Sequence, residues 1–252
     1  GITRLDLLNY IAHGIIKGAG DAAVESIIDE RKQRGIYKDV FDFVNRVNLR
    51  TVNKKTLESL AYAGAFDSFS IHRAVYFDTS TGGTFIENLI RYANRQAEDK
   101  AASQSSLFGM MENGGGAGVS TPKIPVVEQW GPLEKLKYEK DVVGIYISGH
   151  PLDDFRLELD SFCNCTLDKV LEFKNKEIAI AGIVTSVQER YSKNGNPFCI
   201  FKLEDYQGSL ELSLFGNDYV NLGRYVVQDR FLYIKGKVQT RWGSQDNWEF
   251  KI

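Results

Sequence analysis

The feature that most constrains the fold is a change in hydrophobic period between the two ends of the chain. From Leu5 to Ala65 apolar residues recur at helical spacing, whereas from Lys176 onward they alternate with polar residues, as in half-buried strands. Residues 101–125, rich in Ala, Ser, Gly and Met, separate the two patterns. Such a run buries too little apolar surface to offset its ordering entropy. The sequence therefore predicts an α+β multidomain protein whose all-α and β domains are joined by a mobile linker.

The helical half resolves into short helices with recognisable ends. We expect the first over 21–34, ended by Gly35 as a C-cap, the second near 39–47, and the third near 53–63 with Asn53 as its N-cap. A further helical region is expected over 72–100, interrupted at 79–83, and another over 132–143. The predicted organisation is a helical domain over 1–100, a linker over 101–129 and a helical connector over 130–172.

The β half contains five strand-like segments at 177–189, 198–205, 209–215, 231–240 and 248–252. The pair Asn194-Gly195 favours a hairpin between the first two, and a short helix is expected over 217–225. Three strands, a helix and two further strands is the order of an oligonucleotide-binding barrel, the OB-fold. We therefore predict a five-stranded OB-fold β-barrel over 173–252.

Composition narrows the kind of partner. Hydrophobic residues make up 43% of the 252 residues, charged residues 25%, and the net charge is −2, so any site for an anion must be built locally. No apolar run is long enough to span a bilayer, so no membrane partner is expected. The three cysteines lack paired or metal-ligand spacing, which favours a reducing cytoplasm. Because Gly1 follows no initiator Met, we expect a piece of a longer protein.

The first candidate site is a glycine-containing turn directly before the helix at 21–34. Gly18 and Gly20 flank one small residue, which allows unusual backbone angles and close approach of the amides to a ligand. The helix start adds free N–H groups and the positive end of the dipole, so a phosphate is the natural occupant. The candidate contacts are Lys17, Gly18, Ala19 and Gly20. The alternative is a tight interhelical turn without a ligand.

A second turn, at residues 49–55, again joins two short helices. Arg46, Arg50, Lys54 and Lys55 supply positive charge there, with no acid among them in the sequence. Two such turns in succession can hold neighbouring phosphates of a duplex without reading bases. The candidate contacts are Arg50, Thr51, Val52, Asn53, Lys54 and Lys55. This turn lacks the Gly-x-Gly of the first, which places more weight on its cations; the alternative is a solvated basic helix start.

The segment from Ile15 to Ser68, IIKGAG through AGAFDS, resembles the tandem helix-hairpin-helix region of the bacterial replicative DNA polymerase III α subunit family. QSSLFG, LEKLKYEKDVVGIYISGHPLDDF and the C-terminal barrel follow in the same order, so the resemblance covers essentially the whole chain. It implies a cytoplasmic replicase that works in DNA replication with other subunits and grips duplex DNA through the two turns. It also implies a parent DNA-directed DNA polymerase, a nucleotidyltransferase of the transferase class using Mg²⁺, whose catalytic carboxylates lie upstream of Gly1.

Gln104-Ser-Ser-Leu107-Phe108 resembles the internal sliding-clamp-binding motif of that family. Leu107 and Phe108 would fill a pocket on the clamp while the Gln104 amide fixes direction. A flexible segment that folds onto a preformed groove gives modest, exchangeable affinity. The alternative is a contact between the end of a helix and its own domain.

The barrel offers candidate contacts for single-stranded DNA, because bases can stack on aromatic rings while Lys and Arg follow the backbone. The resemblance implies a template-strand role for this domain. The alternative is that these aromatic residues are ordinary sheet formers that pack on a neighbouring domain. The candidates are Arg190, Tyr191, Lys193, Phe198, Lys202, Phe215, Lys235, Lys237, Arg241 and Trp242.

No set of residues predicts catalysis. A polymerase needs clustered carboxylates for two metals, and none is evident; His13, His72 and His150 are scattered. We therefore expect no catalytic residue, metal site or cofactor in this chain. Two other classes stay open: a piece of a repair enzyme such as an NAD-dependent DNA ligase, whose Lys-x-Asp-Gly motif is absent, and a scaffold whose hairpins bind proteins.

Overall fold

The computed structural model describes residues 16–106, 120–241 and 246–252. The chain divides into two compact units, Gly1–Ser148 and Gly149–Ile252. This division falls inside the connector predicted over 130–172, whose first helix belongs to the helical unit. Gln104 lies in a described helix, although nothing is described of its side chain, and Leu107, Phe108 and Trp242 lie outside the described residues.

The helical unit is built from five described α-helices and two short 3₁₀ segments. They are α2 (Asp21–Arg34), α3 (Val40–Arg46), α4 (Lys54–Tyr62), η1 (Asp67–Phe69), η2 (Arg73–Phe77), α5 (Phe85–Ser106) and α6 (Pro132–Val143). Both predicted caps are confirmed: Gly35 ends α2 with φ 81°, and the Asn53 side chain accepts a hydrogen bond from the Thr56 amide at 3.1 Å. The expected interruption at 79–83 also separates η2 from α5.

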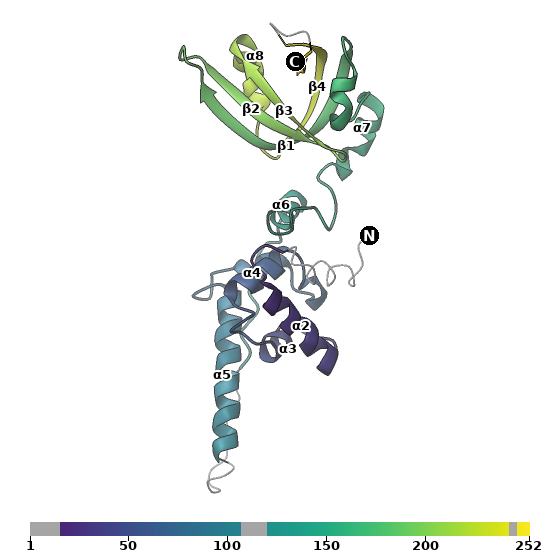
Figure 1. Cartoon of the computed structure of the whole chain (residues 1–252). Helices are drawn as coiled ribbons and strands as arrows, with labels where there is room; N and C mark the ends of the chain where they lie inside the picture. The colour runs from purple at the N-terminus through teal and green to yellow at the C-terminus, as the bar shows by residue number, and fades with distance from the viewer. Residues whose placement is uncertain (1–15, 107–119, 242–245) are drawn as a thin grey trace. The chain divides into compact units, whose positions relative to one another are not determined.

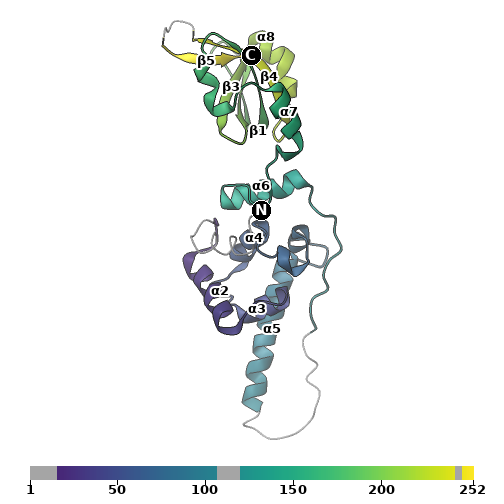
Figure 2. The ribbon, with the colours of Figure 1, turned by 90° about the vertical axis from the view of Figure 1, so that its right-hand side faces the viewer.

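The linker was expected to begin at residue 101, but α5 continues to Ser106. Ala, Ser and Gln do not prevent helix formation, so this stretch is compatible with six further helical residues although its composition is typical of linkers. The N-terminal half of α5 buries Phe85, Ile86 and Leu89 against the other helices, while residues 97–102 are exposed. Figure 2 shows this exposed part extending beyond α2 and α3.

A buried charge network fastens α6 to the rest of the helical unit. Arg73 and Glu139, 5% and 0% exposed, pair at 2.7 Å, and Arg73 also bonds Asp67 at 2.7 Å. The second Glu139 oxygen accepts the amides of Ile147 and Ser148, each at 2.9 Å. Buried charges are tolerated when every atom is paired in this way.

The second unit is a curled five-stranded antiparallel sheet around one core (Figure 1). The strands β1 (Glu177–Tyr191), β2 (Pro197–Glu204), β3 (Ser209–Phe215), β4 (Phe231–Thr240) and β5 (Trp248–Lys251) pair in the order β3-β2-β1-β4-β5. The segments η3 (Asp153–Phe155), α7 (Arg156–Phe162) and η4 (Leu167–Glu172) precede the sheet, and α8 (Gly216–Leu222) with η5 (Gly223–Tyr225) separates β3 from β4. This arrangement confirms the predicted OB-fold.

The alternation predicted for the strands separates buried residues from exposed ones. Phe201, Leu203, Leu212, Leu214 and Val238 are each at most 4% exposed and share one cluster. Residues of the opposite parity, including Lys202, Phe215 and Lys235, are exposed. The barrel therefore presents an outer surface whose side chains can be assigned from strand register.

Candidate nucleic-acid interface

Of the two glycines of the first turn, only Gly18 needs to be glycine. Gly18 has φ +92°, and a methyl group there would lie 2.7 Å from Ser59 Oγ and 3.2 Å from Lys55 Cε. Gly20, the N-cap of α2, has an ordinary φ of −73° and open space around it. The expectation that both glycines supply backbone angles closed to other residues is therefore corrected to Gly18 alone.

The second turn is closed by Asn48. Its backbone oxygen accepts the amides of Thr51 and Val52 at 3.1 and 2.8 Å, and its side chain accepts the amide of Arg50 at 3.0 Å. The chain then enters α4 through the Asn53 cap. In this turn the hydrogen bonds to Asn48 fix the backbone conformation, whereas in the first turn the positive φ of Gly18 makes the conformation possible.

The two turns touch each other. The Thr56 hydroxyl of α4 donates to the Gly18 carbonyl at 3.3 Å, and Gly18 lies against the Lys55 side chain. Lys17, Gly18 and Gly20 in the first turn are exposed, as are Arg50 and Asn53 to Lys55 in the second. The predicted contact residues of both turns therefore share one accessible surface.

Both helix starts on this surface carry amides without acceptors. At the start of α2, the amides of Gly18, Gly20, Asp21 and Ala22 donate no hydrogen bond within the described chain. At the start of α4, the same holds for the amides of Asn53, Lys54 and Lys55. Free amides at a helix start attract anions. The first turn of α2 contains the carboxylate of Asp21, whereas the first turn of α4 contains no acid of its own.

Three of the predicted contact residues stabilise the turns and do not face solvent as contacts would. Ala19 and Val52 are 6% and 0% exposed, and their amides bond Ile16 O and Asn48 O. Thr51 is half-buried, and its hydroxyl donates to Asn48 O at 3.0 Å. Ala19 and Val52 are therefore corrected from contact residues to anchors that fix the turns to the core.

Arg46 is also corrected. Its guanidinium bonds Glu30 and Asp42, both at 3.1 Å, and the Gly35 carbonyl at 2.9 Å. It also stacks over the Tyr37 ring at 4.4 Å, which leaves the side chain 11% exposed. Arg46 therefore joins α2 to α3 and adds no charge to the candidate interface.

Lys54 has acidic neighbours that are distant in sequence or one helical turn away. Its Nζ lies 2.7 Å from Glu87 Oε1 on α5 and 3.7 Å from Glu58 Oε1. The hydrogen bond with Glu87 raises the pKa of Lys54, and the same bond lowers the pKa of the Glu87 carboxyl. Two acidic residues from outside the sequence of the second turn, Glu58 and Glu87, therefore lie beside it.

On the barrel, the predicted single-strand contacts form two groups. In the first, Phe198 of β2 lies opposite Phe215 of β3 and next to Arg190 of β1. The two rings stack with centroids 4.8 Å apart, and Phe215 is 56% exposed. Lys202 is on the same face of β2, with exposed Tyr191 and Lys193 at the turn between β1 and β2. This group combines aromatic faces with cations.

The second group is on β4 and β5. Lys235 and Lys237 line an open basin of about 700 Å³ with Lys251, which pairs with Lys237 across the strands. Lys202 and Lys235 pair with Ser186 and Ala179 of β1. At about 3.3 Å per residue, Ser186 and Ala179 are roughly 20 Å apart along β1, so the two groups are separate. Lys251 was not predicted as a contact, although its alternation with inward-facing Phe250 could have revealed it. Arg241, which was predicted, lies 4.0 Å from Glu249.

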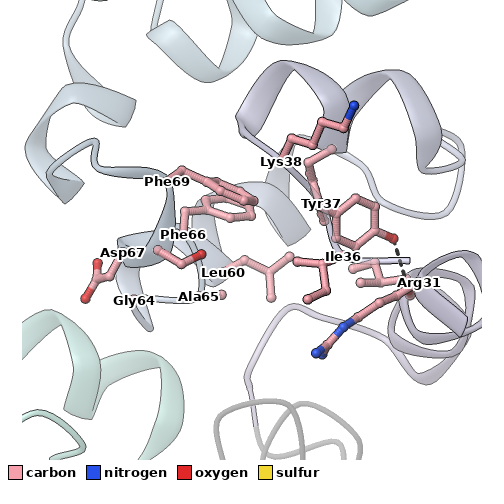
Figure 3. Close-up of a pocket in the computed structure, with 13 residues that line it drawn as sticks. Arg31, Ile36, Tyr37, Lys38, Leu60, Gly64, Ala65, Phe66, Asp67 and Phe69 are labelled. Atoms are coloured by element: carbon pink, nitrogen blue, oxygen red, sulfur yellow. Dashed lines mark hydrogen bonds between the residues drawn. The ribbon is translucent and has the colours of Figure 1, made fainter. Parts of the chain in front are cut away.

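A pocket of about 520 Å³ in the helical unit is distinct from the candidate interface (Figure 3). Its lining is mainly apolar, from Ile27, Ile36, Leu60 and Phe66, and the Tyr37 hydroxyl is occupied by the Ile27 carbonyl at 2.8 Å. None of the predicted contact residues lines it.

Neither a metal-binding cluster nor a membrane-spanning helix is present among the described residues. They contain no group of three or more His, Cys, Asp or Glu side chains placed to hold a metal ion. They also contain no helix of the length and apolarity needed to cross a membrane.

Comparison with known families assigns both regions. Residues 10–76 match the helix-hairpin-helix motif, and residues 178–252 match the OB-fold nucleic acid binding domain. The fold and the exposed turns thus define a chain that combines these two modules.

Comparison with individual proteins is more specific. The chain is 31% identical over 230 residues to the DNA polymerase III subunit alpha of Haemophilus influenzae and 28% identical over 226 residues to that of Vibrio cholerae, each match covering 89% of the chain. It is 37% identical over 207 residues, 80% of its length, to that of Campylobacter jejuni. These matches cover 19%, 19% and 16% of the relatives, so the chain spans less than a fifth of their length. Over most of its length, the chain resembles a C-terminal region of the DNA polymerase III alpha subunit.

Proposed function

We propose that this chain is the DNA-gripping region of a replicative DNA polymerase and that its two hairpin turns hold the backbone of duplex DNA. The observation that carries the proposal is the contact between the turns, which puts two sets of free amides on one exposed surface. Lys17, Arg50 and Lys55 flank these amides. Donors and cations arranged in this way suit phosphate oxygens and do not reach base edges.

Duplex titration over a range of salt concentrations tests this function. Each neutralised phosphate contributes about −0.9 to the slope of log affinity against log salt. Lys17, Arg50 and Lys55, which form no ion pair within the described chain, therefore predict a slope of roughly −3, the same for unrelated duplex sequences. A protein-binding scaffold would instead show no duplex binding near physiological ionic strength, or binding that does not change with salt.

We propose that the barrel holds single-stranded DNA through its aromatic group, since each base stacked on a ring is worth roughly 1–3 kcal/mol. Phe198→Ala with Phe215→Ala is expected to weaken binding of a labelled single-stranded oligonucleotide by about tenfold or more, measured by fluorescence anisotropy. Phe162→Ala, which removes a ring that is 61% exposed on α7, is the control and should bind like the unaltered chain. Equal affinity of the double variant and the control would contradict the assignment.

We propose that residues 104–108 bind a sliding clamp, on the strength of the QSSLF sequence and its place at and beyond the end of α5. Leu107→Ala with Phe108→Ala should abolish retention of the chain on immobilised clamp, because both apolar anchors are lost. Duplex affinity should be unchanged, which controls for folding. Clamp retention by the variant would place the binding motif elsewhere.

The properties of the longer protein are also proposals, because the chain represents only part of its relatives. They are DNA polymerase activity with Mg²⁺, contacts with other replicase subunits and a cytoplasmic location. Support for each comes from similarity to the DNA polymerase III alpha subunits.

A further inference from the structure

The ion pair between Lys54 and Glu87 joins the second turn to a helix that starts more than thirty residues later in the chain. Lys54 is the first residue of α4, and its Nζ lies 2.7 Å from Glu87 Oε1. Within the described chain it is the only cation of the two turns with a carboxylate within 4.0 Å, since Lys17, Arg50 and Lys55 form no such pair. The pair therefore neutralises one specific member of the candidate grip.

Glu87 is held at this position by its own helix. Its other oxygen accepts the Thr84 amide at 2.8 Å, and its amide donates to the Thr84 hydroxyl at 3.2 Å. This reciprocal pair is a capping box at the start of α5. Gly83 leaves the space that the carboxylate occupies, because a methyl group there would lie 2.6 Å from Glu87 Oε2. The contacts within α5 therefore hold the Glu87 carboxylate beside the start of α4.

We propose that Glu87 is an affinity-limiting residue of the hairpin grip: it competes with phosphate for Lys54 and places a fixed negative charge beside the DNA backbone. The inference rests on the proposed function of the turns and adds a residue outside them. A phosphate at the start of α4 must share Lys54 with the carboxylate or displace it. In either case duplex binding is weaker than amides and lysines alone would give, as suits a grip that must move along its substrate.

The test is Glu87→Gln in the complete chain. Glutamine keeps an acceptor for the Thr84 amide, so the capping box and the fold are retained while the charge is removed. Duplex affinity at low salt is expected to rise about two- to fivefold, the range of an exposed ion pair, with a steeper salt dependence. Glu98→Gln is the matched control, because it makes the same charge change on the exposed part of α5, about three helical turns further along.

A double-mutant cycle separates competition for Lys54 from a general charge effect. In a Lys54→Gln background, Glu87→Gln should raise affinity less than it does in the unaltered chain, because competition for Lys54 is gone and only the charge beside the backbone remains to be removed. Glu87→Gln affinity equal to that of the unaltered chain, or a gain matched by Glu98→Gln, would overturn the inference while leaving salt-dependent duplex binding, and hence the proposed function, intact. Absence of duplex binding by the unaltered chain would overturn both.

Discussion

Gly18→Ala is expected to lower the stability of the helical unit and to weaken duplex binding together. A side chain at φ +92° costs about 1–3 kcal/mol, and the added methyl group would meet Ser59 Oγ at 2.7 Å. Relief of that contact moves the first turn away from α4 and so separates the two sets of free amides. Urea unfolding followed by far-ultraviolet circular dichroism measures the first effect, and a duplex titration measures the second.

Gly20→Ala is the matched control for this prediction. Its backbone angles suit any residue, and no atom lies within 4 Å of the added methyl group. Glycine is the better N-cap, so alanine here should cost about 0.5–1 kcal/mol, less than the backbone strain and the close contact together cost at Gly18. If Gly18→Ala and Gly20→Ala behaved alike, the first turn would not depend on the close approach of Gly18 to α4.

Lys54→Glu with Lys55→Glu is expected to weaken duplex binding by at least about tenfold, equally for unrelated sequences, and to reduce the magnitude of the salt slope by about two. Two phosphate contacts are lost, and the new carboxylates add to those of Glu58 and Glu87. The fold should be retained, because acidic residues in the first turn of a helix are favourable to its dipole. Mobility shifts of two duplexes of different sequence provide the measurement.

The control for this pair is Arg95→Glu with Lys100→Glu, an equal change of charge at two exposed positions of α5. It should alter affinity much less, since these side chains lie about two and three and a half helical turns beyond Glu87, where α5 meets the second turn. A loss as large as that of the Lys54 and Lys55 variant would mean that net charge, and not the second turn, determines binding.

Elements with strong local signals could be predicted from the sequence. The helices α2 and α6 have the expected bounds because Gly35 and Gly144 stop them, with φ of 81° and 87°. The strands follow from alternation and from the Asn194-Gly195 turn. The first hairpin could be recognised because a turn that needs positive φ usually has glycine at that position, here Gly18.

Tertiary charge pairs could not be predicted in this way. Arg46 is as basic in the sequence as Lys55, yet its partner Glu30 is sixteen residues away and holds it inside the unit. Lys54 meets Glu87 only because α4 and α5 pack together. A count of charges along the chain therefore overestimates the cations available to DNA, and only the fold shows which are already paired.

The same limit applies to the barrel. Strand parity identifies outward side chains such as Phe198, Lys202 and Lys235, but it does not say how far apart they are. Strand register separates them into an aromatic group and a lysine group on different rungs of β1.

The central claim is that both turns hold one DNA backbone. Amide chemical-shift mapping of the ¹⁵N-labelled chain with a short duplex tests it most directly. The amides of Gly18, Gly20, Asn53, Lys54 and Lys55 should shift together with a single binding curve. Shifts confined to one turn, or to neither while the duplex still binds, would contradict it.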